Sequence, residues 1–312
     1  FKTLRDKFRA HVEQMLKLAG DKNAAEEAGW VLALETEIAK VHWPLEKARD
    51  DELTYNLWPR AKLDGLGTGY NWNQILQAAG VDKQTEFLVG QPDTLTAVSK
   101  LIDSVPLHQW KAYMRYHALV GYAQCLPKAF DEERFAFYGT VVRGQPKQQE
   151  RWRRGMALLS NNMGEPLGQL YVAKYFPPSA KADMQAMIGH FRTSLGDLID
   201  KAAWMSASTK KEAHAKLAAF GAKLGYPDKW KDYSALKIDR ADLVGNIKRA
   251  TAWQWAYDTN KLGKAIYTHE WLMVPQENNA YYWPQRNEIV FPAGILQAPY
   301  YDPAADLASN YG

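Results

Sequence analysis

The stretch from Gln276 to Leu296 constrains the fold most, because it carries the one clear β pattern in an otherwise helical sequence. Residues 276–283 and 286–291 are two β-prone runs, and Pro284 lies in the loop between them. Two such runs joined by a short loop predict an antiparallel hairpin. Because proline has no backbone N–H, this hairpin suits the edge of a sheet. An exposed edge can bind an extended peptide through main-chain hydrogen bonds, although an ordinary structural hairpin has the same pattern.

Apolar residues at helical spacing fill most of the remaining chain, so the predicted fold class is mainly α. A short strand is expected over residues 85–90. Gly65, Gly67 and Gly69 alternate without a preceding strand or a following Lys-Ser/Thr, which favours a loop over a phosphate site. The principal helices are predicted over residues 1–19, 24–42, 180–203 and 239–262, with further ones from Pro106 and from Thr209.

Three side chains carry further predictions about these helices. His117 lies on an apolar stripe that starts at Pro106, which predicts a packed core histidine and not a ligand. Thr209 with Glu212 has the spacing of a capping box. Asp239 is the predicted cap of the helix that follows it.

Composition excludes several functional classes. The 312 residues suffice for one large domain or two, and a net charge of +4 with interleaved acids and bases gives no reason to expect nucleic acid. Cys125 is the single cysteine, so no internal disulfide can form. No apolar run reaches the length of a membrane span. Phe1 is not an initiator Met, so any signal or anchor segment would lie outside this sequence.

The residues of the predicted hairpin closely resemble the neprilysin-like zinc metallopeptidase family. The similarity covers Asn279-Ala280-Tyr281-Tyr282 and the run from Arg286 to Gln297, and it continues to Asn310-Tyr311-Gly312. Further stretches with family wording are RDDELTYNLWPR (residues 49–60), GEPLGQLYVAKYFPP (164–178) and LGYPDKWKDYSAL (224–236). The lack of a disulfide suggests a bacterial-type member.

This resemblance implies a domain organisation. Residues 1–223 would form a multi-helical N-terminal capping region, and residues 224–275 would connect it to the catalytic domain. Residues 276–312 would begin a gluzincin-type α+β catalytic domain with its β-hairpin and substrate edge strand. On this reading the chain is truncated just before the expected His-Glu-x-x-His helix.

A zinc peptidase of this type needs two histidines at i and i+4 on one helix, with a glutamate beside the first. None of the seven histidines satisfies this pattern. His269-Glu270 has no second histidine, and in Ile188-Gly189-His190-Phe191 a phenylalanine stands in the place of the base. The resemblance therefore implies zinc as the cofactor of the intact enzyme, with its ligands downstream of Gly312. We expect no catalytic or metal-ligating residue within this stretch, and no activity of these residues alone.

The resemblance also implies which residues bind substrate. Asn279 and Ala280 would hold the substrate backbone, Tyr281 would continue the same strand, and Arg5 would contact the primed side of a bound peptide. The intact protein would hydrolyse short peptides on the amino side of hydrophobic residues, by zinc-activated water. The alternative is a non-catalytic peptide-binding or scaffold protein that lacks the zinc site.

Expected partners are oligopeptide substrates and, as an alternative to one continuous enzyme, a separate C-terminal catalytic segment. The family favours the bacterial periplasm or secretion, and the cytoplasm stays open.

Overall fold

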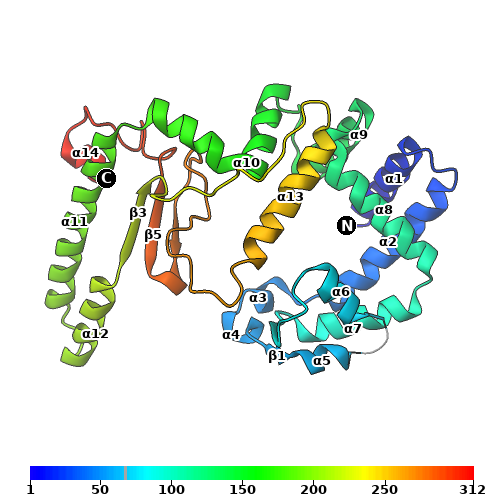
Figure 1. Ribbon diagram of the computed structural model, residues 1–312, viewed down its shortest axis with the longest axis horizontal. Helices are drawn as coiled ribbons and strands as arrows, with labels where there is room; N and C mark the ends of the chain where they lie inside the picture. The colour runs from blue at the N-terminus through cyan, green and yellow to red at the C-terminus, as the bar shows by residue number, and fades with distance from the viewer. Residues whose placement is uncertain (67–68) are drawn as a thin grey trace. The chain divides into compact units, whose positions relative to one another are not determined.

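The computed structural model describes residues 1–66 and 69–312, so Gly67 of the predicted glycine loop lies outside the described residues. The chain divides into two units. The first comprises residues 1–149 and 240–245, and the second comprises residues 150–239 and 246–312. Helices dominate the described residues and the strands are short and few, which confirms the predicted mainly α class (Figure 1). Within residues 1–66 and 69–312, no helix has both the length and the apolar character needed to cross a membrane.

The first unit is built on packed helices and a two-stranded antiparallel sheet, β1–β2. Its core joins α1, α2 and α8 through residues such as Val12, Val31 and Tyr116, all with no exposed surface. Its elements are α1 (Lys2–Leu18), α2 (Ala24–Val41), α3 (Leu45–Ala48), α4 (Asp51–Thr54), β1 (Leu57–Pro59), α5 (Arg60–Asp64), α6 (Trp72–Ala78), β2 (Glu86–Leu88), α7 (Pro92–Ser104), α8 (Leu107–Tyr122), the 3₁₀ turn η1 (Ala123–Cys125), α9 (Lys128–Arg134) and the π-helical η2 (Phe135–Val142).

The prediction for His117 is wrong. Its side chain is 43 % exposed and its Nε2 lies 2.8 Å from a carboxylate oxygen of Glu35. The buried stripe of α8 instead contains Ala112 and Tyr116. Helical spacing alone allows either the face with His117 or the face with Ala112 and Tyr116 to be the buried one. The packing of α1 and α2 on α8 decides which face is covered.

The second unit contains the longer helices and a three-stranded sheet. In α10 the backbone of Met163 is non-helical (φ −142°, ψ 45°), so the helix kinks there, three residues before Pro166. Its elements are α10 (Arg151–Tyr175), α11 (Pro178–Lys201), α12 (Ala207–Ala218), β3 (Gly221–Gly225), α13 (Leu243–Thr259), β4 (Tyr281–Trp283), the 3₁₀ turn η3 (Pro284–Arg286), β5 (Glu288–Pro292) and α14 (Leu307–Tyr311). The first turn of α13, up to Gly245, belongs to the first unit.

The strand order of this sheet is β3-β5-β4. β4 and β5 are antiparallel, with Tyr282 opposite Ile289, which confirms the predicted hairpin. The first strand is shorter than predicted, because regular pairing begins only at Tyr281. The third strand, β3, runs parallel to β5 and was not predicted. Its sequence, Gly-Ala-Lys-Leu-Gly, has no β-branched or aromatic residue, so its strand conformation comes from pairing with β5 and not from propensity.

Both predicted helix caps are displaced by three residues. Ser206, and not Thr209, caps α12, because its hydroxyl accepts a hydrogen bond from the Thr209 amide at 3.2 Å. Asp242, and not Asp239, accepts from the Gly245 amide at 2.8 Å at the start of α13. In each case another residue that caps equally well, Ser206 or Asp242, directly precedes the first residue of the helix.

One face of the sheet packs against α11. Leu224 of β3 and Phe291 of β5 contact Met184 and Met187 of α11 in a shared apolar cluster. Figure 1 shows α11 alongside β3 in the second unit. The predicted boundary between residues 223 and 224 falls within β3. The three-segment division of the chain stays a prediction.

Candidate functional site

The candidate site is the outer edge of β4. Among the described residues, β4 pairs with β5 on one side only, whereas β5 pairs with a strand on both sides. Each unpaired strand edge presents main-chain N–H and C=O groups to solvent. An extended peptide can pair with such an edge.

The chain that leads into β4 is held in place by side-chain and main-chain hydrogen bonds. Gln276 Nε2 donates to Ser160 Oγ at 2.8 Å and to the Gly164 carbonyl at 3.1 Å, and both acceptors lie on α10. The Gly294 amide donates to the Pro275 carbonyl at 2.8 Å. A Cβ at Gly294 would lie 2.6 Å from the Glu277 carbonyl oxygen, so glycine is required for this close approach. The start of the edge is therefore fixed to the helical part of the same unit.

Asn279 is exposed and its side-chain orientation is set by its own backbone. Its Oδ1 accepts a hydrogen bond from the Ala280 amide at 2.9 Å. This bond assigns the oxygen and nitrogen of the side chain, because only the oxygen can accept. Within the described part of the chain Nδ2 has no partner, so it can donate to a carbonyl of a bound molecule. Ala280 is half-buried directly beside β4.

The Tyr281 side chain has a structural role. Its hydroxyl accepts a hydrogen bond from the Leu272 amide at 2.8 Å, which fastens the loop before β4. Burial raises the pKa of the Tyr281 hydroxyl, and the nearby Glu288 carboxylate adds to this, while the Leu272 amide and Arg286 act in the opposite direction. The phenol group is thus neutral at ordinary pH and acts as a hydrogen-bond acceptor within the fold.

Arg5 lies elsewhere in the chain. It is an exposed residue on α1 of the first unit, whereas Asn279, Ala280 and Tyr281 are consecutive in the second unit. Three of the four predicted residues therefore belong to the second unit, and Arg5 belongs to the first. The substrate roles of all four stay predictions.

The ion pair between Lys223 of β3 and Glu288 of β5 was not predicted from the sequence. Lys223 Nζ of β3 lies 2.7 Å from Glu288 Oε1 of β5, with side chains 15 % and 11 % exposed, and also donates to the Glu270 carbonyl at 2.8 Å. Arg286 NH1 lies 3.9 Å from the same Glu288 oxygen, and its guanidinium stacks over the Trp283 ring. No spacing rule joins Lys223 to a residue 65 positions later, because the pair depends on the parallel pairing of β3 with β5.

The described residues offer no zinc site. In the chain outside residues 67–68, no group of three or more His, Cys, Asp or Glu side chains is arranged to hold a metal ion. His190, which stands in the near-match to the family motif, has its Nδ1 hydrogen-bonded to the Tyr311 hydroxyl. The zinc that the resemblance implies therefore does not fit the residues present, and the ligands expected downstream of Gly312 stay a prediction.

The sequence of this chain is similar to those of known proteins. Family models described as peptidase family M13 match residues 1–227 and residues 279–312. An endothelin-converting enzyme homolog of Locusta migratoria is 28 % identical over 329 residues, covering 97 % of this chain and 45 % of the relative. Human endothelin-converting enzyme 1 is 31 % identical over 301 residues, covering 90 % of this chain and 38 % of the relative.

Two solved structures are also similar to this chain. The Mycobacterium tuberculosis zinc metalloprotease Zmp1 in complex with an inhibitor is 39 % identical, with a TM-score of 0.92 over 99 % of this chain and 48 % of that one. PepO from Lactobacillus rhamnosis shares the fold at 24 % identity, with a TM-score of 0.89 over 99 % of this chain and 50 % of that one.

The fold and the hairpin are those of a zinc metallopeptidase of the neprilysin type. The chain belongs to peptidase family M13. It spans half or less of the length of these relatives.

Proposed function

We propose that this chain supplies the peptide-holding edge strand of an M13 zinc metallopeptidase, and that the intact enzyme cleaves short peptides on the amino side of hydrophobic residues. The observation that carries the proposal is the open outer edge of β4 with Asn279 placed beside it. β4 is held by β5, and its outer edge is unpaired within the described residues. The free Nδ2 of Asn279 adds a donor for a peptide carbonyl.

The chemistry divides between this chain and residues outside it. Main-chain pairing would orient an extended peptide along β4, which fixes the register of the scissile bond. A bound zinc ion would supply Lewis-acid activation of water in the intact enzyme. The described residues contribute binding and orientation. Arg5 is proposed to contact the primed side of the peptide through its guanidinium.

The test uses an enzyme that joins this chain to the rest of an M13 catalytic domain, compared with residues 1–312 alone. A ten-residue peptide with one leucine is incubated with each, and the products are identified by mass spectrometry. We expect one cleavage on the amino side of the leucine, abolished by a chelator, with the longer protein only. Cleavage elsewhere would contradict the specificity, and no hydrolysis by a zinc-loaded longer protein would contradict the function.

A non-catalytic peptide-binding or scaffold protein is the second candidate, because an open strand edge can bind an extended peptide without any chemistry. It predicts peptide binding at β4 without hydrolysis in any zinc-loaded form. For the compartment we propose the bacterial periplasm or secretion, which detection of the protein outside the cytoplasm would support.

A further inference from the structure

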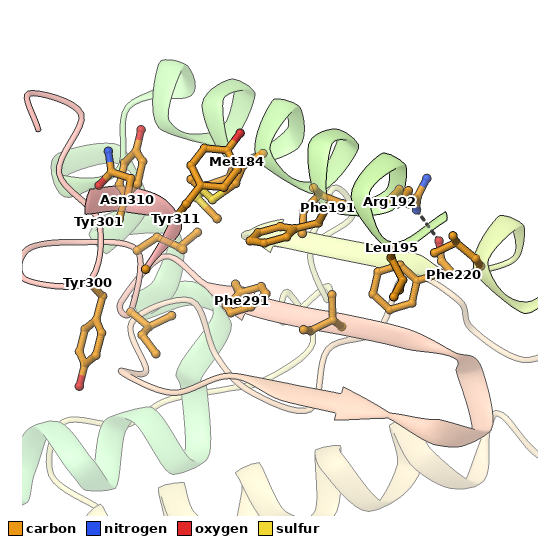
Figure 2. A pocket seen from close by; sticks show the side chains of 17 residues that line it. Met184, Phe191, Arg192, Leu195, Phe220, Phe291, Tyr300, Tyr301, Asn310 and Tyr311 are labelled. Atoms are coloured by element: carbon orange, nitrogen blue, oxygen red, sulfur yellow. Dashed lines mark hydrogen bonds between the residues drawn. The ribbon is translucent and has the colours of Figure 1, made fainter. Parts of the chain in front are cut away.

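The second unit contains a polar cavity with a volume of about 360 Å³. Its walls come from α10, from α13 and from residues 271–274. It differs from a larger cavity of the same unit, between α11 and β5, which is lined mainly by apolar side chains such as Met184, Phe191 and Phe291 (Figure 2). The polar cavity instead presents a buried carboxylate, several amide side chains and aromatic rings to a small molecule.

Close packing between α10 and residues 271–274 fixes two of these walls. A Cβ at Gly164 would lie 2.4 Å from Val274 Cγ1, so glycine is required for this approach. The kink of α10 lies one residue before Gly164. Because Pro166 has no N–H, it cannot donate the regular helical hydrogen bond to the Asn162 carbonyl. The wall of the cavity therefore includes an interrupted part of the helix, and its position is set by packing.

Glu165 is a buried carboxylate in this wall. Its side chain is 8 % exposed. Oε2 accepts a hydrogen bond from the Lys231 amide at 2.7 Å, whereas Oε1 lies 3.5 Å from Lys231 Nζ. Within residues 1–66 and 69–312, Oε1 accepts no hydrogen bond. A buried carboxylate oxygen needs donors, so Oε1 is available to a donor inside the cavity.

Two amide side chains in the wall also have an oxygen atom to offer. Asn162 Nδ2 donates to the Leu158 carbonyl at 2.8 Å, and Gln254 Nε2 donates to Asp258 Oδ2 at 2.8 Å. The nitrogens are thus used within the unit, while neither amide oxygen accepts a hydrogen bond from the part of the chain that the structure describes. Together with Glu165 Oε1, these two oxygens give the cavity three acceptors.

The charged groups in and beside the cavity carry an excess of negative charge. Lys231 pairs with Glu165. Lys261 pairs with Asp258 at 2.7 Å and with Glu270 at 3.1 Å. Three carboxylates therefore face two ammonium groups in this network. A cation bound in the cavity would balance the excess, whereas an anion would add to it.

Aromatic side chains complete the lining. They are Tyr233, Trp255 and Trp271. Burial raises the pKa of the Tyr233 hydroxyl to about 12, and the negative charge of Glu165 adds to this rise. The phenol is therefore neutral at ordinary pH. Aromatic faces attract organic cations and also bury aliphatic groups.

We propose that this cavity binds the primary ammonium group of a small aliphatic amine. An ammonium group has three N–H donors and no acceptor, which matches the three oxygens of Glu165, Asn162 and Gln254. Its charge balances the excess of carboxylate, and its aliphatic chain would lie against the aromatic lining. A sugar or another neutral polyol would not balance that charge. The residues that line the cavity do not include β4, so the inference goes beyond the proposed function.

The test is calorimetric titration of residues 1–312 with pentylamine, without zinc or peptide. We expect one pentylamine per chain, with a dissociation constant below about 1 mM. Two probes of similar length are the ligand controls. 1-Pentanol has no charge, and pentyltrimethylammonium has the charge but no N–H donor, so each should bind at least about tenfold more weakly. A blocked tripeptide with one lysine identifies the source of the group, because its binding indicates a peptide side chain and its failure to bind indicates a free amine.

Three variants locate the binding. Glu165→Gln should weaken pentylamine binding at least about tenfold, because it removes the charged acceptor. Asp258→Asn should weaken it about threefold, since the Asp258 side chain is 48 % exposed and its charge is screened by water. Asp197→Asn is the matched control, because Asp197 is an exposed carboxylate on α11, which does not line this cavity. It should leave the affinity within about twofold.

Several outcomes would overturn the proposal. One is the absence of saturable pentylamine binding, and another is binding of 1-pentanol or pentyltrimethylammonium as tight as that of pentylamine. Unchanged affinity in both Glu165→Gln and Asp258→Asn would place the amine elsewhere and overturn it too. If Glu165→Gln sharply lowers the melting temperature, Asp258→Asn decides alone, and unchanged binding in that variant overturns the proposal. The titration involves no hydrolysis, so a failure of the proposed function leaves its result unaffected.

Discussion

Strands β4 and β5 are neighbours in one sheet and differ in almost every physical respect. β5 pairs on both sides, and its Glu288 and Val290 are 8 % and 0 % exposed. β4 has three residues, pairs on one side within the described chain, and leaves Tyr282 44 % exposed. The comparison indicates a division of roles: the buried strand fixes the position of the hairpin, and the edge strand leaves main-chain groups open to solvent.

This division follows from the marginal stability of a two-stranded hairpin in water. β4 and β5 alone would not hold an edge in a defined place. Pairing of β5 with β3, and packing of both on α11, supply the burial that the hairpin lacks. Substitutions in β5 should therefore change the stability of the unit, whereas substitutions at the open edge should change peptide binding and leave stability almost intact.

The largest effect is expected for Glu288→Ala in β5. This substitution leaves the Lys223 ammonium, 15 % exposed, without its carboxylate partner. Removing one member of a buried ion pair costs about 3–5 kcal/mol. We expect a loss of about 3 kcal/mol in the free energy of unfolding, measured by urea titration of residues 1–312 and followed by tryptophan fluorescence.

The double variant Lys223→Met with Glu288→Leu is the control. It removes the ammonium and the carboxylate and keeps the volume, while the Arg286 guanidinium keeps its hydrogen bond to the Tyr267 carbonyl at 3.0 Å. The double variant should therefore unfold within about 1 kcal/mol of the unsubstituted chain. Equal losses in the single and the double variant would show that the pair contributes through its geometry and not through its charges. No loss in Glu288→Ala would contradict the idea that β5 is the support of the edge.

Strands β4 and β5 also show which parts of the fold and the site could be predicted from the sequence. The hairpin was predicted because its pattern is local, with Pro284 in its loop and β-prone residues on both sides. β3 and the Lys223–Glu288 pair were not, because both depend on contacts between residues more than 60 positions apart. The peptide-binding role of Asn279 and Ala280 came from the family resemblance and stays a prediction. The hydrogen bond between the Leu272 amide and the Tyr281 hydroxyl appears only in the folded chain.

The second prediction concerns the open edge. In an enzyme that contains this chain and the rest of the catalytic domain, Asn279→Ala removes the donor proposed for a substrate carbonyl. An unpaired polar partner costs about 1–3 kcal/mol, so kcat/KM should decrease by roughly ten- to a hundredfold. Zinc content should be unchanged, because Asn279 is proposed to contact the peptide only. Steady-state kinetics with elemental analysis of the same sample measures both quantities.

Asn278→Ala is the matched control, since Asn278 is the adjacent exposed asparagine. It should keep kcat/KM within about threefold of the unsubstituted enzyme, because no role at the edge is proposed for it. An unchanged kcat/KM in Asn279→Ala would show that Asn279 makes no functional contact with the substrate. A decrease accompanied by loss of zinc would show that the residue acts on the metal site.

The smallest of the three main effects is expected for Tyr281→Phe, which tests the hydroxyl of this residue separately from the main chain of the edge. The variant keeps the ring and the main chain of the edge but deletes the oxygen that accepts from the Leu272 amide. A hydrogen bond of this kind contributes about 1 kcal/mol, and Leu272 is 65 % exposed, so water can replace the lost acceptor. We expect a loss of about 1 kcal/mol or less in the free energy of unfolding. Tyr282→Phe should change it less, since the Tyr282 hydroxyl donates to Asn287 Oδ1 at an exposed position.

Alkaline titration provides a second measurement on Tyr281. Burial raises the pKa of its hydroxyl in the folded chain above the ordinary value of about 10. The folded state therefore holds this proton more tightly than the unfolded state does, so the contribution is complete below pH 10 and is lost as the pH rises through the folded pKa. The free energy of unfolding should decrease less steeply above pH 10 in Tyr281→Phe than in the unsubstituted chain. Identical slopes would show that the phenol is as free to ionise in the folded chain as in the unfolded one, and that Tyr281 belongs with the exposed edge and not with its support.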